Sequence, residues 1–286
     1  MPYNPGVFSR LRTLPKRPVF VVSDRSGLTA ETLSHTLLSQ FPDTEFQQQA
    51  LPFIDSPEKV RRAVETIGRA GREAGCRPLV FTTFVDDAFN EGLATVEAEI
   101  FDLFTPFIHR MEEALEQTSS HKPGQSHSIS DFTRYQQRIE AVNFAMRCDD
   151  GLHHQDYDRA TLILVGASRS GKTPTCLYLA LHFGFYPANY PLTEEDFGQG
   201  QLPKPLVPYK AKTFGLTIDP VRLHQIRTER RPGSDYASLE RCRLDISRAE
   251  RMFRANGIPF GDSTNYSVEE LGSTIKHQMG LESPLY

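Results

Sequence analysis

The sequence contains few cysteines and no long apolar segment. Its four cysteines, Cys76, Cys148, Cys176 and Cys242, lie far apart along the 286 residues and form no C-x-x-C pair. Disulfide frameworks and structural zinc sites need closer or paired cysteines, so we expect free thiols in a reducing compartment. No stretch approaches the roughly 20 apolar residues of a membrane-spanning helix, and the first residues lack the apolar centre of a signal peptide. These absences predict a cytoplasmic protein with no membrane partner.

A strong excess of charge of either sign is also missing. The 32 basic and 36 acidic residues give a net charge of −4. Bulk binding to nucleic acid usually requires a strongly basic face, so we expect no nucleic-acid partner. Hydrophobic residues make up 38% of the chain and charged residues 24%. This composition favours a chain that buries a core over one that stays disordered.

Short apolar segments alternate with helical patterns in the first part of the chain. Residues 18–24, 46–51 and 78–83 are predicted strands, and helices are predicted between them. From residue 86 to residue 117 the pattern is helical, with a break predicted near Pro106. Alternation of this kind indicates a parallel sheet covered by helices.

The alternation resumes in the second part. Residues 161–166 and 214–218 are predicted strands, and a helix is predicted from about Lys172 to Phe183. Ser267 and Glu270 have the spacing of a capping box, which predicts the start of the last helix.

A polar, turn-rich segment, TSSHKPGQSHSIS, separates the two parts. We therefore predict an α/β protein with two domains. The first, residues 1–118, is an α/β domain with a mostly parallel sheet. Residues 119–130 are a linker or flexible loop, and residues 131–286 form a second α/β domain.

The strongest chemical pattern is GASRSGKT, which matches G-x-x-x-x-G-K-[ST] and lies between a predicted strand and a predicted helix. Glycines allow a tight turn that points several backbone N–H groups at one anion, and the helix adds the positive end of its dipole. The pattern predicts a P-loop kinase-like second domain. The predicted nucleotide-binding residues are Gly166, Ala167, Ser168, Arg169, Ser170, Gly171, Lys172 and Thr173. The alternative is a glycine-rich turn with a surface lysine.

Two side chains of this loop have separate predicted roles. Lys172 is expected to reach the terminal phosphates during catalysis, and the Thr173 hydroxyl is expected to bind Mg²⁺. A P-loop enzyme also needs a carboxylate near the metal. Asp219, at the end of a predicted strand, is the candidate for a catalytic and metal-binding carboxylate. The alternative is that Asp219 only caps the next helix.

Further catalytic candidates lie outside the loop. Arg227, which clusters with Arg230 and Arg231, can clamp a transferring phosphoryl group, although a solvated basic helix end is the alternative. His127 and Asp131 are candidates for the general base that activates an attacking hydroxyl. The alternatives are a solvated loop histidine and a helix N-cap, and the identity of the base stays open.

The segment DRSGLT, residues 24–29, is similar to SRSGKT of the P-loop pattern. Both follow a predicted apolar strand and precede a predicted helix. One hypothesis is a second anion-binding turn at residues 23–29. The alternative is an ordinary N-capped turn, and Leu28 replaces the lysine there.

Several longer motifs resemble those of the bacterial phosphoenolpyruvate synthase regulatory proteins, which are related to the plant pyruvate, phosphate dikinase regulatory proteins. The motifs include VSDRSGLTAETL, the G-x-SR-x-GKTPT loop, FGLTIDP and STNYSVEE. The resemblance covers residues 18–282. One departure is SDRSG where many relatives have SDGTG, which puts the second anion turn in doubt.

The resemblance implies a bifunctional regulator whose protein partner is phosphoenolpyruvate synthase. Such proteins phosphorylate a threonine of the synthase with ADP and release AMP. They remove the phosphoryl group from that threonine with inorganic phosphate, which produces pyrophosphate. It implies ADP at residues 166–173, with Mg²⁺. Two alternatives stay open: an ATP-dependent small-molecule kinase, and a nucleotide-sensing module without catalysis. The oligomeric state also stays open, a homodimer included.

Overall fold

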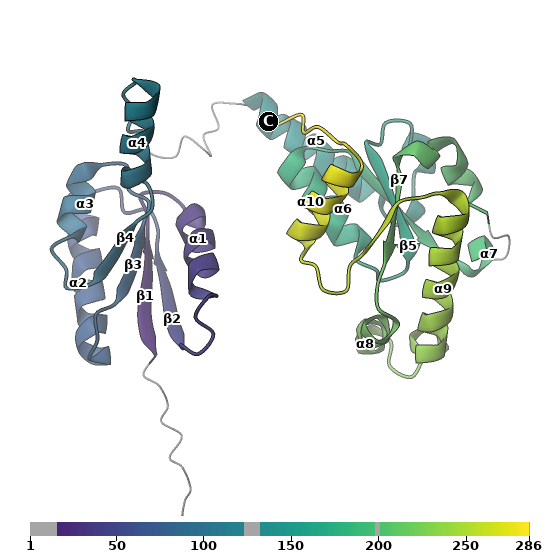
Figure 1. Cartoon of the computed structure of the whole chain (residues 1–286), viewed down its shortest axis with the longest axis horizontal. Coiled ribbons are helices and arrows are strands. Elements are labelled where there is room, and N and C mark those ends of the chain that lie inside the picture. The colour runs from purple at the N-terminus through teal and green to yellow at the C-terminus, as the bar shows by residue number, and fades with distance from the viewer. Residues whose placement is uncertain (1–15, 123–131, 198–200, 286) are drawn as a thin grey trace, which may run out of the picture. The chain divides into compact units, whose positions relative to one another are not determined.

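The computed structural model describes residues 16–122, 132–197 and 201–285. The chain divides into two compact units, residues 1–128 and residues 129–286. Figure 1 shows a sheet flanked by helices in each unit. Among the described helices, none combines the length and the apolar character needed to cross a membrane.

The first unit contains a four-stranded sheet in the order β2-β1-β3-β4, with every pair of neighbours parallel. Its strands are β1 (Arg17–Val22), β2 (Phe46–Leu51), β3 (Leu79–Thr82) and β4 (Glu99–Asp102). The central strand β1 is apolar and buried, as expected for a strand covered on both faces. The first three strands confirm the sequence prediction.

Helices cover both faces of this sheet (Figure 1). They are α1 (Leu28–Leu38) on one face, α2 (Pro57–Ala74) and α3 (Asp87–Leu93) on the other, and α4 (Thr105–Leu115) beyond the end of β4. The main core joins side chains of β1 and β3 to those of α2 and α3. A smaller cluster joins Val19 and Phe81 to Leu38 of α1.

The prediction of a helical segment from 86 to 117 is wrong in its middle. The segment holds α3, then β4, then α4, and Pro106 lies in the first turn of α4 and breaks no helix. Proline is tolerated there because its missing N–H would have had no partner within the helix. Asp102 ends β4 by accepting hydrogen bonds from the backbone N–H groups of Phe104 and Thr105. Residues 99–102 form a strand because they pair with β3, and the periodicity of the sequence does not reveal this pairing.

The second unit repeats this topology, with four parallel strands in the order β6-β5-β7-β8. They are β5 (Leu162–Ala167), β6 (Pro187–Leu192), β7 (Thr213–Thr217) and β8 (Phe260–Asp262). The predictions for β5 and β7 are confirmed. Prolines within β6 and the three-residue length of β8 hide these two strands from periodicity arguments.

Alternate residues of β5 enter two separate cores. Leu162 and Leu164 contact the helices of one face, and Ile163 and Val165 contact those of the other. The first face is covered by α5 (Phe132–Arg147), α6 (Lys172–Phe183) and α10 (Val268–Gln278), and α9 (Leu239–Asn256) covers the second. Two more helices, α7 (Glu194–Phe197) and α8 (Pro220–Arg230), follow β6 and β7.

Two local predictions for the second unit are confirmed. The helix predicted from Lys172 to Phe183 begins and ends at those residues. Ser267 and Glu270 form both hydrogen bonds of a capping box. Together the two parallel sheets and their covering helices confirm the predicted α/β fold class.

Candidate functional site

The loop from Gly166 to Thr173 connects β5 to α6 at the carboxyl end of the sheet. Strand β5 lies between β6 and β7, so the chain leaves it at the point where strand order reverses. Open parallel sheets bind their ligands at such points. Gly171 has φ 88° and no side chain caps α6, which leaves the first N–H groups of the helix available to an anion.

The loop is wound tightly against β7. A methyl group at Gly166 would collide with the carbonyl oxygen of Leu216 and would lie 2.9 Å from Ser170 Oγ. Ser263 Oγ donates to the carbonyl oxygens of Ser170 and Thr217, at 3.0 Å each, which ties the loop to the sheet. Arg169 has φ 76°, a left-handed conformation that costs an arginine energy and that a packed loop must enforce.

The Lys172 side chain is buried inside this loop, with 5% of its surface exposed. Its ammonium group donates hydrogen bonds to the carbonyl oxygens of Gly166 at 3.1 Å and Ala167 at 2.9 Å. Burial lowers the pKa of Lys172 from 10.5 to about 8, an effect that the nearby Asp150 and Asp149 carboxylates partly oppose. The loop therefore encloses a cation whose charge the protein only partly compensates.

A carboxylate lies next to the hydroxyl of Thr173. Thr173 Oγ1 donates to Asp149 Oδ1 at 2.8 Å. Asp149 begins a short turn, Asp149–Gly151, that follows α5. The buried amide of Asn189 on β6 holds this turn, because it donates to Asp149 and accepts from the backbone N–H of Asp150 at 3.0 Å. Sequence reasoning missed Asp149, and the paired acids before Gly151 were its only local signal.

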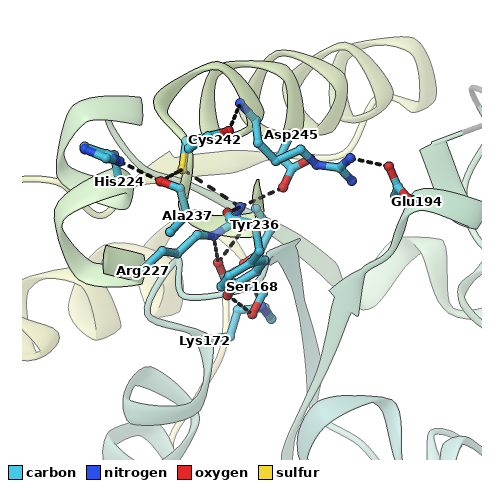
Figure 2. A network of polar contacts seen from close by, with 12 residues as sticks. Ser168, Lys172, Glu194, His224, Arg227, Tyr236, Ala237, Cys242 and Asp245 are labelled. Atoms are coloured by element: carbon cyan, nitrogen blue, oxygen red, sulfur yellow. Dashed lines mark hydrogen bonds and ion pairs between the residues drawn. The ribbon is translucent and has the colours of Figure 1, made fainter. Parts of the chain in front are cut away.

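Arg227 supports the loop from the side of α8 (Figure 2). Its guanidinium group donates to the Ser168 carbonyl oxygen at 3.1 and 3.3 Å, to the Tyr236 carbonyl oxygen at 3.0 Å, and to Asp245 Oδ2 at 2.8 Å. Only 1% of the Arg227 side chain is exposed. Asp245 also pairs with Arg241, which in turn pairs with Glu194. Every nitrogen of Arg227 is thus bonded to the protein, which supports a positioning role.

Comparison with known proteins shows the family of the chain. The sequence model of the family described as Kinase/pyrophosphorylase matches residues 19–275. This chain belongs to the Kinase/pyrophosphorylase family. The match spans nearly all of both units, including the loop at 166–173.

Relatives in this family share about half of their residues with the chain. A protein of Halorhodospira halophila is 52% identical over 269 residues, 93% of this chain and 97% of its own length. One of Alkalilimnicola ehrlichii is 47% identical over 274 residues, 96% of this chain and all of its own length. A third, of Legionella pneumophila strain Corby, is 46% identical over 267 residues. All three bear the name "Putative phosphoenolpyruvate synthase regulatory protein".

In this Kinase/pyrophosphorylase chain, Asp219 is a helix cap. Its Oδ1 accepts from the backbone N–H groups of Val221 and Arg222, at 2.9 Å each, and the residue is exposed. The structure thus shows the cap that the sequence left as the alternative. A metal-binding or catalytic Asp219 stays a prediction, as does a phosphoryl clamp formed by Arg227. His127 and Asp131 lie outside the described residues.

The turn at residues 23–29 shares with the loop of the second unit a left-handed glycine before the helix, but Arg25 lacks the positive φ of the corresponding Arg169. Gly27 has φ 79° and ψ 0°, Gly171 has φ 88° and ψ 8°, and neither following helix has a side-chain cap. The side chains differ as well, because Leu28 replaces the lysine and Asp24 is buried, with its pKa raised mainly by that burial. Anion binding at this turn stays a prediction.

The described residues contain no metal site built from protein side chains alone. No three histidine, cysteine, aspartate or glutamate side chains converge there as a set of metal ligands. Mg²⁺ often keeps several waters and takes only one or two protein carboxylates, with substrate phosphates completing its shell. The oxygen pair of Thr173 and Asp149, 2.8 Å apart, fits that manner of binding.

Proposed function

We propose that this chain is an ADP-dependent protein threonine kinase that inactivates phosphoenolpyruvate synthase. With inorganic phosphate it reverses the modification and forms pyrophosphate. Family membership and the names of the relatives support the partner and the class of reaction. The observation that carries the proposal is the buried Lys172 inside a loop that leads into the uncapped start of α6, next to the Thr173–Asp149 pair.

In the forward reaction the loop holds the diphosphate of ADP. The backbone N–H groups at the start of α6 and the Lys172 ammonium group surround the β-phosphate. Lys172 exchanges its hydrogen bonds to Gly166 and Ala167 for bonds to phosphate oxygens. The threonine oxygen of the partner forms a bond to the β-phosphorus while the bond to the bridging oxygen breaks. AMP leaves with that oxygen, and a base takes the hydroxyl proton of threonine.

The Mg²⁺ ion of this reaction fits Thr173 and Asp149. Both supply oxygen atoms, and Asn189 fixes the carboxylate between β6 and α6. When bound, Mg²⁺ neutralises part of the phosphate charge. We assign the metal carboxylate to Asp149 and not to Asp219, because Asp149 is the one that contacts Thr173.

The reverse reaction uses the same loop for the transferred phosphoryl group. An oxygen of inorganic phosphate bonds to the phosphorus of phosphothreonine, the bond to the threonine oxygen breaks, and that oxygen takes the proton that phosphate loses. The products are threonine and pyrophosphate. A loop that holds a diphosphate serves both directions, because ADP and pyrophosphate share that group. We also propose a cytoplasmic location, because the proposed partner is a metabolic enzyme.

The pKa of Lys172 predicts how ADP affinity depends on pH. The free protein carries a charged ammonium group at pH values below about 8 and a neutral amine above. ADP binds the charged form, so binding above that pH requires proton uptake. We expect Kd to rise by up to about tenfold per pH unit above pH 8 and to be insensitive to this group below about pH 7. Calorimetric titrations with ADP across this range measure it. An affinity unchanged through the alkaline range contradicts the prediction.

The decisive experiment for the proposed function incubates purified phosphoenolpyruvate synthase with this protein and ADP. We expect mass spectrometry to find one phosphorylated threonine on the synthase, AMP as the nucleotide product, and removal of the phosphate when inorganic phosphate is added. A parallel incubation replaces ADP with ATP. Formation of ADP from ATP with a small acceptor would instead support a small-molecule kinase. Inhibition of the synthase without any modification would support a nucleotide-sensing module.

A further inference from the structure

A cavity of about 260 Å³ lies beside the loop. Its lining residues are Ser168, Arg169, Arg230, Arg231 and Tyr236. Ser168 and Arg169 belong to the 166–173 loop. Arg230 is the last residue of α8, Arg231 follows it, and Tyr236 lies in the short helix between α8 and α9. We call it the arginine cavity. It is separate from the contacts described for Lys172, Thr173 and Asp149.

The arginine cavity collects positive charge that the protein does not neutralise. Within the described residues, no carboxylate pairs with Arg169, Arg230 or Arg231, although the neighbouring Arg227 and Arg241 both pair with acids. A favourable helix dipole accounts for basic residues at the end of α8, but not for the convergence of a loop arginine on the same cavity. Guanidinium groups stay protonated, so their mutual repulsion persists until an anion joins them.

Contacts with Arg227 and with each other hold Ser168 and Tyr236 in the wall of the cavity (Figure 2). Tyr236 donates its hydroxyl hydrogen to Ser168 Oγ at 2.9 Å, and the Arg227 guanidinium carbon lies 4.1 Å from the centre of the Tyr236 ring. Because Ser168 Oγ accepts from Tyr236, its own hydrogen is available to a ligand. The cavity therefore offers guanidinium and hydroxyl donors.

Its size and its arginine lining suit a small anion. Pockets for drug-sized ligands measure about 300–1,000 Å³, and one water occupies roughly 30 Å³ in the liquid. A volume of about 260 Å³ holds one phosphate group with several waters. Arginine binds phosphate through paired N–H groups, which gives strong and geometrically defined contacts.

We propose that the arginine cavity binds inorganic phosphate, the co-substrate of the dephosphorylation reaction, beside the phosphate that the loop holds. The reaction assigned to this ion depends on the proposed function, but its binding does not. Phosphate held here lies next to Ser168 and Arg169, which belong to the loop proposed to hold the other phosphate. The phosphothreonine of the partner carries the same chemical group and is the competing source.

The test removes the charges of Arg230 and Arg231 with the double variant Arg230→Gln/Arg231→Gln. Its matched control, Arg243→Gln/Arg251→Gln, removes two exposed charges of α9 that do not line the cavity. We expect the KM for inorganic phosphate in pyrophosphate formation to rise by about 10-fold or more in the first variant, while its Kd for ADP stays within about threefold of the native value. The control is expected to match the native protein in both. A KM for phosphate that changes less than about twofold, or an equal loss of ADP affinity, overturns the proposal.

A second measurement separates this proposal from the proposed function. Titration of the native protein with inorganic phosphate alone, without synthase or nucleotide, is expected to show binding that weakens by about 10-fold or more in the double variant. That result supports the cavity even where no dephosphorylation is found. If the KM for phosphorylated synthase rises and that for inorganic phosphate does not, the cavity binds the phosphothreonine and the assignment is wrong.

Discussion

Replacing Lys172 with methionine is expected to weaken ADP binding by about 100-fold and to lower the rate of phosphoryl transfer by roughly 10³-fold. Lys172 is the buried cation of the loop, and its ammonium group is within hydrogen-bond distance of two loop carbonyls. Methionine has a similar length and fills the same space but cannot donate to a phosphate. Calorimetry with ADP and phosphorylation of the synthase measure the two effects.

The fold is expected to survive this change, so the loss is one of function. Burial already disfavours the charged form of Lys172, as its lowered pKa indicates, so a neutral side chain removes a desolvation cost along with two hydrogen bonds. The thermal midpoint of unfolding checks this. Lys204→Met, at an exposed lysine, is the matched control and is expected to behave as the native protein does. Native ADP affinity in the Lys172 variant would require a different phosphate site.

Replacing Asp149 with asparagine is expected to lower phosphoryl transfer by roughly 100-fold and to raise the Mg²⁺ concentration needed for half-maximal rate by about 10-fold. Asparagine keeps the shape of the side chain and can still accept from Thr173, but it loses the negative charge that attracts the metal. ADP affinity measured without Mg²⁺ is expected to change little. The rate as a function of Mg²⁺ concentration, at saturating ADP, measures the effect.

The matched control for this change is Asp219→Asn. Asp219 caps α8 through its side chain, and asparagine is an equally good cap. We therefore expect near-native activity and stability. The two variants together decide between the carboxylate that the sequence indicated and the one that contacts Thr173. A large loss of activity in the Asp219 variant with none in the Asp149 variant would return the metal to Asp219.

The loop was predictable because its chemistry is local. Eight consecutive residues, an apolar strand before them and a helix after them are all visible in the sequence, and the structure places them in that order. The same is true of the capping box at Ser267 and of five of the eight strands found in the described residues. Each of these features depends on residues that are close together in the chain. The sequence shows the spacing of such residues directly.

The partners of the loop come from distant segments and were not predictable in the same way. Asp149 reaches Thr173 across 24 positions, and only the hydrogen bonds from Asn189 on β6 show why it lies there. Strand β4 was hidden in a segment that reads as helix until β3 pairs with it. The sequence indicated that Arg227 binds phosphate. In the structure Arg227 is buried and donates hydrogen bonds to Ser168 and Asp245, so it supports the loop.

The sequence by itself determined the α/β class, the loop at 166–173 and the lysine at its centre, because these follow from backbone conformation and from contacts between near neighbours. Only the tertiary structure decided which carboxylate lies next to Thr173, which arginine supports the loop, and that Arg169, Arg230 and Arg231 share one cavity. The physical reason is that these choices depend on the parallel pairing of strands, which brings together residues that are far apart in the chain.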